Sequence, residues 1–169
     1  MLGLGLGLNR TVGKVRPKNE VAYNPETWAE WTSLKGVTFD VTGASMYGTS
    51  SSGWPQIKRS TSIKTSTKYG VLLSVLSNTW TEALVMNTNI TGFYKLIAAA
   101  GTTGNIKEIF TSQATISENN FSFMPWSALE EGELIKIKDI RVFELPVGSQ
   151  IESDFENLTA DQLNEKYPF

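Results

Sequence analysis

The segment GELIKIKDIRVFEL, residues 132–145, alternates apolar and polar side chains more clearly than any other part of the chain. Its apolar positions are Ile135, Ile137, Ile140, Val142 and Leu145, with lysine, aspartate, arginine and glutamate between them. A spacing of two is typical of a strand with one buried face. The parity of the apolar positions changes near Lys138–Asp139, which predicts a β-bulge at this point.

Shorter segments of similar character precede this strand, separated by turns rich in glycine, serine and asparagine. The predicted strands are 37–42, 57–67, 68–77, 80–87, 106–116 and 121–126, and residues 92–105 run into a glycine turn. The Ser/Gly-rich stretch 44–55 is predicted to be a loop. Because Pro125 cannot donate to a ladder, 121–126 is predicted to be an edge strand. Many short strands with frequent turns indicate a sandwich or a barrel.

Two segments outside this pattern predict helices. In NPETWAEWTSL, residues 24–34, Asn24 is a candidate N-cap and Pro25 takes the first helical position, which would place Trp28, Trp31 and Leu34 on one face against the sandwich. In the C-terminal tail, Thr159 and Gln162 have the spacing of a capping box and predict a short helix. A helix this short needs a surface on which to dock.

Composition excludes several kinds of chemistry. The 169 residues include neither cysteine nor histidine, so disulfides, thiolate or histidine catalysis and the usual zinc sites are excluded. Carboxylate-only chemistry remains open, but the spacing of the Asp and Glu residues selects no catalytic pair. The net charge is -2 and no apolar run reaches the length of a membrane span, so neither nucleic-acid binding nor membrane insertion is expected. The expected protein is therefore not an enzyme and needs no cofactor.

The chain opens MLGLGLGLNR, with leucine at every second position. A strand of this kind has one apolar face and one bare face, and it cannot form a core alone. Laid along another subunit, its leucines would fill pockets while the backbone adds to a sheet edge. We therefore predict an assembly anchor, made of Leu2, Leu4, Leu6, Leu8 and Arg10. The alternative is a loose terminus, and the spacing does not fit a dinucleotide-binding fingerprint.

The strands 68–77 and 135–145 resemble those of the jelly-roll sandwiches found in carbohydrate-binding modules and galactose-binding-like domains. This resemblance implies an all-β jelly-roll sandwich and a glycan-binding role. The aromatic residues that would stack against sugar rings are Tyr47, Trp54, Trp80 and Trp126. The alternative is that each packs at an end of the core. Jelly rolls of this type sometimes hold a structural calcium ion, for which Asp139 is the candidate ligand.

The flanking segments carry a second resemblance. The tail FELPVGSQIESDFENLTADQLNEKYPF, 143–169, and the Leu/Gly opening are similar to segments of structural proteins of tailed bacteriophages and prophages of Gram-positive bacteria. The resemblance implies a head, neck or tail accessory protein of the virion, assembled in the host cytoplasm, with other virion proteins as partners. Homo-oligomerisation and adhesion to a host-surface glycan, or cementing of neighbouring subunits, are further expectations.

These observations predict three regions. Residues 1–25 form an N-terminal arm, 26–146 the jelly-roll sandwich, and 147–169 a tail with a short C-terminal helix.

Two other functions remain open. The chain could be a free carbohydrate-binding module of a secreted glycan-degrading system, or a small carboxylate-dependent glycan-active enzyme.

Overall fold

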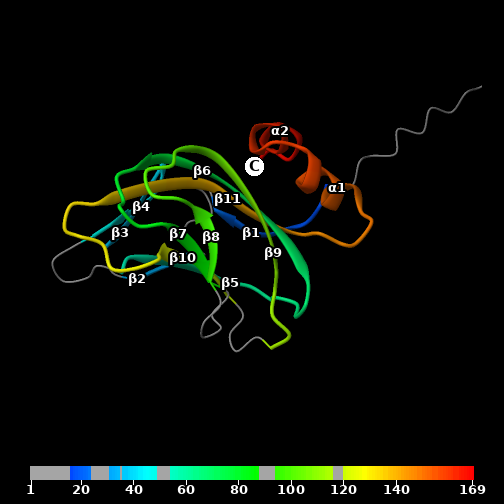
Figure 1. Cartoon of the computed structure of the whole chain (residues 1–169), viewed down its shortest axis with the longest axis horizontal. Helices are drawn as coiled ribbons and strands as arrows, with labels where there is room; N and C mark the ends of the chain where they lie inside the picture. Colours follow the sequence, from blue (N-terminus) through cyan, green and yellow to red (C-terminus); the bar gives the residue numbers. More distant parts are fainter. Residues whose placement is uncertain (1–15, 24–30, 35, 49–53, 88–93, 116–119) are drawn as a thin grey trace, which may run out of the picture.

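The computed structural model describes residues 16–23, 31–34, 36–48, 54–87, 94–115 and 120–169, and these form two antiparallel sheets packed face to face (Figure 1). Sheet A contains, in order, β3 (Val37–Asp40), β4 (Gly43–Tyr47), β11 (Leu134–Glu144), β6 (Lys68–Asn78) and β9 (Gly104–Thr111), and β1 (Asn19–Tyr23) also pairs with β11. Sheet B contains, in order, β2 (Trp31–Leu34), β5 (Gln56–Ser60), β10 (Asn120–Pro125), β7 (Leu84–Asn87) and β8 (Tyr94–Ala98). The fold is the all-β jelly-roll sandwich that the resemblance of the strands 68–77 and 135–145 implies.

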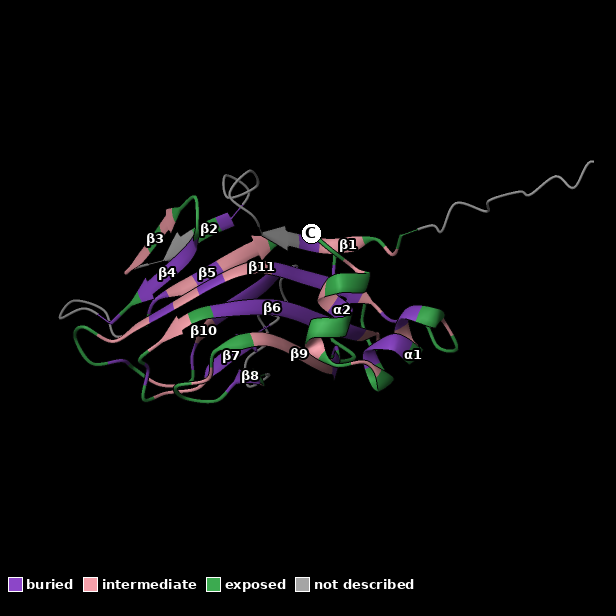
Figure 2. Ribbon diagram, turned by 90° about the horizontal axis from the view of Figure 1, so that it is seen from above, coloured by how far each residue is buried: buried purple, intermediate pink, exposed green. Residues whose placement is uncertain are grey.

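The main core lies between the sheets. It combines alternate side chains from the facing strands with Trp80, which is 2% exposed. Its largest members include Tyr69, Phe110, Phe121 and Phe123, and the first three form a ring cluster with centroids 5.5–6.1 Å apart. Figure 2 shows the resulting band of buried residues along β6 and β11.

The predicted bulge in the long strand is confirmed. The pairing of β11 with β6 shifts between Lys138 and Arg141, and Asp139 has a φ of 51°. Before the bulge Ile135 and Ile137 point into the core, and after it Ile140 and Val142 do so. The shift also turns the intervening residues of the second half of β11 toward the other face of sheet A.

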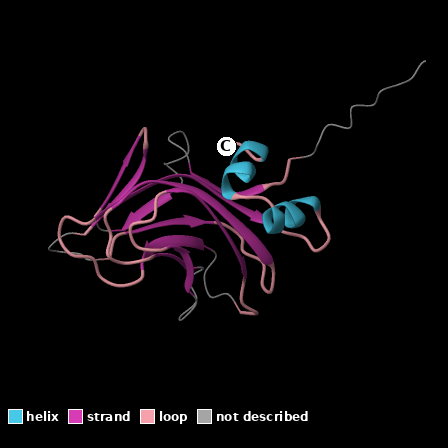
Figure 3. Ribbon diagram, turned by 45° about the horizontal axis from the view of Figure 1, so that its top comes forward, coloured by secondary structure: helices cyan, strands magenta, loops and turns pink. Residues whose placement is uncertain are grey.

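That other face is covered by two C-terminal helices, α1 (Gln150–Asn157) and α2 (Ala160–Lys166). A second apolar cluster holds them there, consisting of Leu72, Phe143, Leu145, Ile151, Phe155 and Leu163. Figures 1 and 3 show both helices on the side of sheet A that faces away from β7, β8 and β10. The capping box of Thr159 and Gln162 is present at the start of α2, as predicted. None of the helices within the described ranges is long and apolar enough to cross a membrane.

Helix α1 was not predicted, because its apolar residues are too few to give a periodic signal. It begins at an N-cap, Ser149, whose side chain accepts a hydrogen bond from the backbone of Glu152. Only Ile151, Asp154 and Phe155 of the helix are buried. The helix is therefore stabilised mainly by docking on the sheet.

Two strand predictions were wrong. The stretch predicted as the loop 44–55 begins with β4, which lies between β3 and β11. Ala44 and Met46 enter the core, but the small and polar residues around them hide the alternation. Residues 121–126 were predicted as an edge strand, whereas β10 lies in the middle of sheet B. The backbone nitrogen of Trp126 donates a hydrogen bond to the carbonyl of Ala83, the residue before β7. The nitrogen of the preceding residue, Pro125, therefore faces the other neighbouring strand, β5. Because β5 begins only at Gln56, it does not extend to the position opposite Pro125.

The N-terminal predictions also changed. Trp31 was expected on a helix, but residues 31–34 form β2, and Trp31 packs in the core near Phe123, with ring centroids 6.2 Å apart. Trp28 and the remainder of the predicted helix, 24–30, lie outside the described residues. Residues 19–23 of the predicted arm form β1, and Val21 is part of the core. The three-region division of the chain otherwise stays a prediction.

Candidate functional site

The outer face of sheet B carries a pair of exposed aromatic rings. Tyr94, at the start of β8, is 43% exposed, and Trp126, directly after β10, is 59% exposed. Their ring centroids lie 5.6 Å apart in an edge-to-face arrangement, with an interplanar angle of 76°. Edge-to-face pairs hold both rings in defined orientations. The pair therefore offers a preformed aromatic surface to solvent.

The strand register fixes what surrounds these rings. Residues directly paired across antiparallel strands point to the same face of the sheet. Starting from Ser122, one row therefore comprises Thr32, Lys58, Ser122, Asn87 and Tyr94. The next outward row contains Gln56, Met124, Val85 and Leu96. The row between them, with Phe123 and Met86, points into the core.

Tyr94 belongs to the first of these rows, and Trp126 lies one outward position beyond the second, so the aromatic pair reaches across the second row. Tyr94 is aligned with Asn87 and Ser122, whereas Trp126 is four residues farther along β10. Neighbouring strands are about 5 Å apart and each residue advances about 3.3 Å, so the two side chains must lean toward each other across the face. Val85, between the two backbone positions, is 1% exposed.

Polar groups accompany the rings on the same face. Ser122 Oγ donates to the backbone carbonyl of Asn87 at 3.1 Å. Asn87 is 8% exposed, and its Oδ1 is buried with no hydrogen-bond partner among the described residues. A buried acceptor of this kind is costly unless something donates to it. Lys58, in the same row, adds a cation beside these groups. The outer face thus combines aromatic, aliphatic and hydrogen-bonding groups, the mixture typical of small-molecule sites.

The structure separates the four aromatic residues predicted to bind a glycan. Trp126 lies on the outer face of sheet B. Trp54 is 45% exposed just before β5, and the register of β5 with β10, extended by three residues, brings position 54 opposite position 126. Tyr47 is 37% exposed at the end of β4 in sheet A. Both the carbonyl of Tyr47 and the side chain of Pro55 lie beside Gly36, so Tyr47 lies near the segment that precedes β5.

Trp80 differs from the other three. It follows β6 in a loop, as predicted, and its backbone nitrogen donates to Asn78 Oδ1 at 3.0 Å. Its side chain, however, is 2% exposed and belongs to the main core. The packing alternative therefore describes Trp80, because no face of its ring is open to a sugar.

The candidate calcium ligand, Asp139, lies at the bulge, 3.5 Å from the ammonium of Lys138. The described residues contain no group of three or more Asp and Glu side chains arranged to hold a metal ion. Among the acidic residues before β11, Glu133 has a structural role, because it accepts hydrogen bonds from the side chain and backbone of Thr81, both at 2.7 Å. The Thr81 side chain in particular lowers the pKa of Glu133. The calcium prediction stays untested.

The predicted assembly anchor, Leu2, Leu4, Leu6, Leu8 and Arg10, lies outside the described residues. Tyr94 was missed, because one aromatic residue beside a glycine turn gives no signal of its own. A second concave region, a groove beside α1 and α2, was also missed. Its lining comes from segments far apart in the sequence, and no short motif marks it.

No protein-family model matches the chain, and no curated protein matches it significantly. Solved structures do match its fold. Xylanase 10B from Clostridium thermocellum, in a structure of its CBM22-1 and GH10 modules with xylohexaose, aligns at a TM-score of 0.50 and 13% identity, over 75% of this chain and 28% of that chain. A family 4 carbohydrate-binding module aligns at a TM-score of 0.48 and 14% identity, over 75% of this chain and 92% of that one.

A third structure, TmCBM61 with β-1,4-galactotriose, has a TM-score of 0.45 and 12% identity, over 76% of this chain and 99% of that chain. Each of these three structures includes a carbohydrate-binding module. At these identities the likeness concerns the fold, which is the one implied by the resemblance of the strands 68–77 and 135–145. Neither the structure nor the comparisons indicate a bacteriophage origin.

Proposed function

We propose that this chain is a non-catalytic carbohydrate-binding module that binds a glycan on the outer face of sheet B. The observation that carries the proposal is the exposed Tyr94–Trp126 pair on a sheet face whose other members are polar or aliphatic. A sugar ring has an apolar face that packs on aromatic rings and hydroxyls that need hydrogen-bond partners. The hydroxyl of Thr32 and the ammonium of Lys58, in the same outward row as Tyr94, supply such partners.

Two further features favour this face. The helices cover the outer face of sheet A, so sheet B is the one whose outer face they leave open. The two outward rows carry Lys58 but no carboxylate among their described residues. Glycoside hydrolysis needs two carboxylates across a cleft, so binding is a better interpretation of this face than catalysis. The fold of the xylanase structure with xylohexaose gives the proposal a precedent.

The proposal therefore follows the alternative prediction from the sequence, a carbohydrate-binding module, and not the main prediction, a virion protein. Display of the module on a bacteriophage particle, with virion partners and a homo-oligomeric anchor, stays a prediction. It depends on residues 1–15, which can be tested by deleting them and measuring association by light scattering.

A panel of neutral oligosaccharides, including xylohexaose, cellotriose and β-1,4-galactotriose, tests the proposal by isothermal titration calorimetry. Trp126→Ala and Tyr94→Ala should each weaken binding of the best ligand about tenfold, because each removes a stacking contact of more than 1 kcal/mol. Phe169→Ala is the matched control, since it removes an aromatic residue that is 44% exposed elsewhere. Binding that survives both ring deletions unchanged would contradict the proposal.

A further inference from the structure

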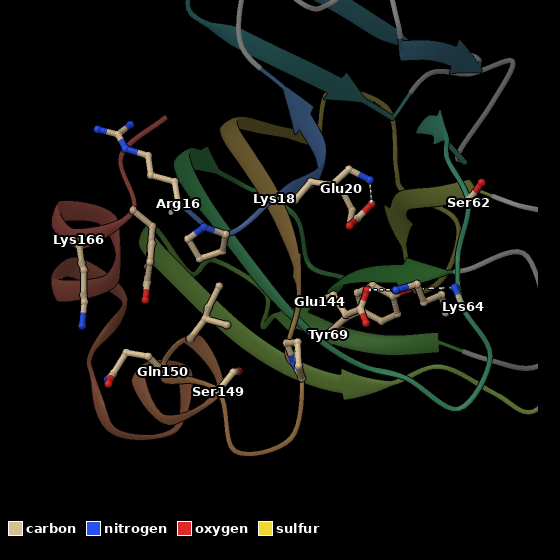
Figure 4. Close-up of a pocket in the computed structure, with 14 residues that line it drawn as sticks. Arg16, Lys18, Glu20, Ser62, Lys64, Tyr69, Glu144, Ser149, Gln150 and Lys166 are labelled. Carbon is tan, nitrogen blue, oxygen red and sulfur yellow. Dashed lines mark hydrogen bonds and ion pairs between the residues drawn. The ribbon is translucent and has the colours of Figure 1, made fainter. Parts of the chain in front are cut away.

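A groove of about 1210 Å³ lies where the segment leading into β1, the loop before β6, the end of β11 and the two helices meet (Figure 4). Its charged lining consists of Arg16, Lys18, Lys64 and Lys166 with Glu20 and Glu144. Four cations against two carboxylates is an unusual balance on a chain whose net charge is -2. The groove is therefore a local region of positive charge.

The two lining carboxylates are already engaged. Lys64 Nζ lies 2.5 Å from Glu144, and Lys18 Nζ lies 2.8 Å from Glu20. Each ammonium has three donors and uses one in these pairs. The paired lysines therefore keep donors available to a ligand, whereas the charge of each carboxylate is largely compensated.

Of the other two cations, Arg16 is the one whose charge no carboxylate of the described residues compensates. Its guanidinium carries five donors. Lys166 pairs at 2.6 Å with Asp154, which lies behind it and does not line the groove. Figure 4 shows Arg16 and Lys166 at the same side of the groove, with the Arg16 guanidinium directed away from the other labelled residues. Arg16 thus lies at the edge of the groove, where an anionic group would enter.

The remaining lining is suited to a polar ligand with some apolar surface. Tyr69, which is 1% exposed, closes the bottom of the groove, and its Oη accepts a hydrogen bond from the backbone nitrogen of Lys64 at 2.9 Å. Ser62 and Ser149 add hydroxyls, and Pro17 and Pro146 add flat apolar surfaces. Hydroxyl groups beside flat apolar surfaces match the two sides of a sugar ring.

We infer that this groove is a second binding site, for an oligosaccharide that carries carboxylates, such as an oligouronate. The inference is independent of the neutral-glycan site on sheet B, because the two sites share no residue. Its chemistry is charge-assisted hydrogen bonding from arginine and lysine to sugar carboxylates, with Ser62 and Ser149 contacting hydroxyls.

The test titrates tetragalacturonate into the full chain by calorimetry at low and at high NaCl, with xylohexaose as the uncharged comparison. Tetragalacturonate should bind, and binding should weaken as salt rises. Arg16→Ala should reduce its affinity about tenfold, since it removes one charge-assisted contact, and Arg16→Lys should reduce it less. Arg16 makes no ion pair within the described part of the fold, so these variants should remain folded, as thermal unfolding will check.

Lys138→Ala is the matched control, because it removes one partly exposed cation outside the groove. Absence of tetragalacturonate binding, or equal losses in Arg16→Ala and Lys138→Ala, would overturn the inference. Equal or tighter binding of a hexa-aspartate peptide would also overturn it, in favour of an acidic peptide site. Because Trp126→Ala should leave tetragalacturonate binding unchanged, failure of the groove and failure of the sheet B site give different results.

Discussion

The ring of Phe155 lies directly against Gly70: a Cβ atom built on Gly70 would be 2.5 Å from Cδ1 and Cε1 of that ring. The contact joins α1 to strand β6 of sheet A. The ring of Phe143, on β11, packs against the same Phe155 ring, with the two ring centroids 5.9 Å apart. Glycine is needed here for close approach, because a side chain would displace the helix.

Gly70→Ala should therefore destabilise the protein, and Phe155→Ala should cost about 3–5 kcal/mol through loss of a fully buried ring. In the Phe155→Ala background the added methyl group has room, so Gly70→Ala should then cost much less. Urea unfolding of the two single variants and the double variant measures this coupling. An equal cost of Gly70→Ala in both backgrounds would show that the ring contact is unimportant.

Asp154 connects the two helices and should make stability sensitive to acid. Its carboxylate is buried, which alone would raise its pKa, but hydrogen bonds from Lys166 at 2.6 Å, from Tyr167 and from Gln150 at 2.8 Å outweigh burial and lower the pKa below 3.8. A carboxylate with a lowered folded-state pKa stabilises the fold above its unfolded value, and this contribution is lost as pH falls through the folded value.

Asp154→Asn should accordingly lower the free energy of unfolding at pH 7 by about 2 kcal/mol and flatten its dependence on pH below 3.8. Glu165→Gln, an exposed neutralisation on the same pair of helices, should change neither quantity appreciably. Chemical unfolding at a series of pH values gives both results. An unchanged acid dependence in Asp154→Asn would contradict this role.

Asn87 and Asn78 should contribute differently to stability. Because the buried Oδ1 of Asn87 accepts no hydrogen bond from the described residues, Asn87→Ala should leave the free energy of unfolding unchanged or slightly higher. Asn78 is the matched control, because its Oδ1 accepts from Trp80 at 3.0 Å and its Nδ2 donates to Thr102 at 3.1 Å. Asn78→Ala should cost about 1–2 kcal/mol. Similar losses in both variants, measured by urea unfolding, would contradict this difference.

Two tryptophans predicted from sequence as equivalent should also behave differently. Trp80→Ala should destabilise the fold by about 3–5 kcal/mol, because the side chain fills the core. Trp126→Ala should change stability by less than about 1 kcal/mol, because the ring is mostly exposed. Thermal unfolding of both variants checks this. A large loss of stability in Trp126→Ala would mean that its ring is structural.

These differences show which parts of the molecule the sequence could predict. The period of two in residues 134–144 and the capping box at Thr159 are local signals, so the bulged strand and the start of α2 were predicted correctly. Strand β4 and helix α1 depend on partners distant in the chain, and their own residues carry weak patterns. The same holds for the sites. Tryptophans in predicted loops are visible in a sequence, but their exposure is not, since Trp80 is buried and Trp54 is exposed. Only the register of β7, β8 and β10 brings Tyr94 to Trp126.

The central claim is that a glycan binds on the outer face of sheet B. Backbone amide chemical shifts, followed by NMR as the best neutral oligosaccharide is titrated, test it most directly. The account predicts that the largest shifts fall in 84–87, 94–98 and 120–126, and that in Trp126→Ala about tenfold more oligosaccharide is needed to produce them. Shifts confined to the groove beside the helices, or to Trp80 and its neighbours in the core, would contradict it.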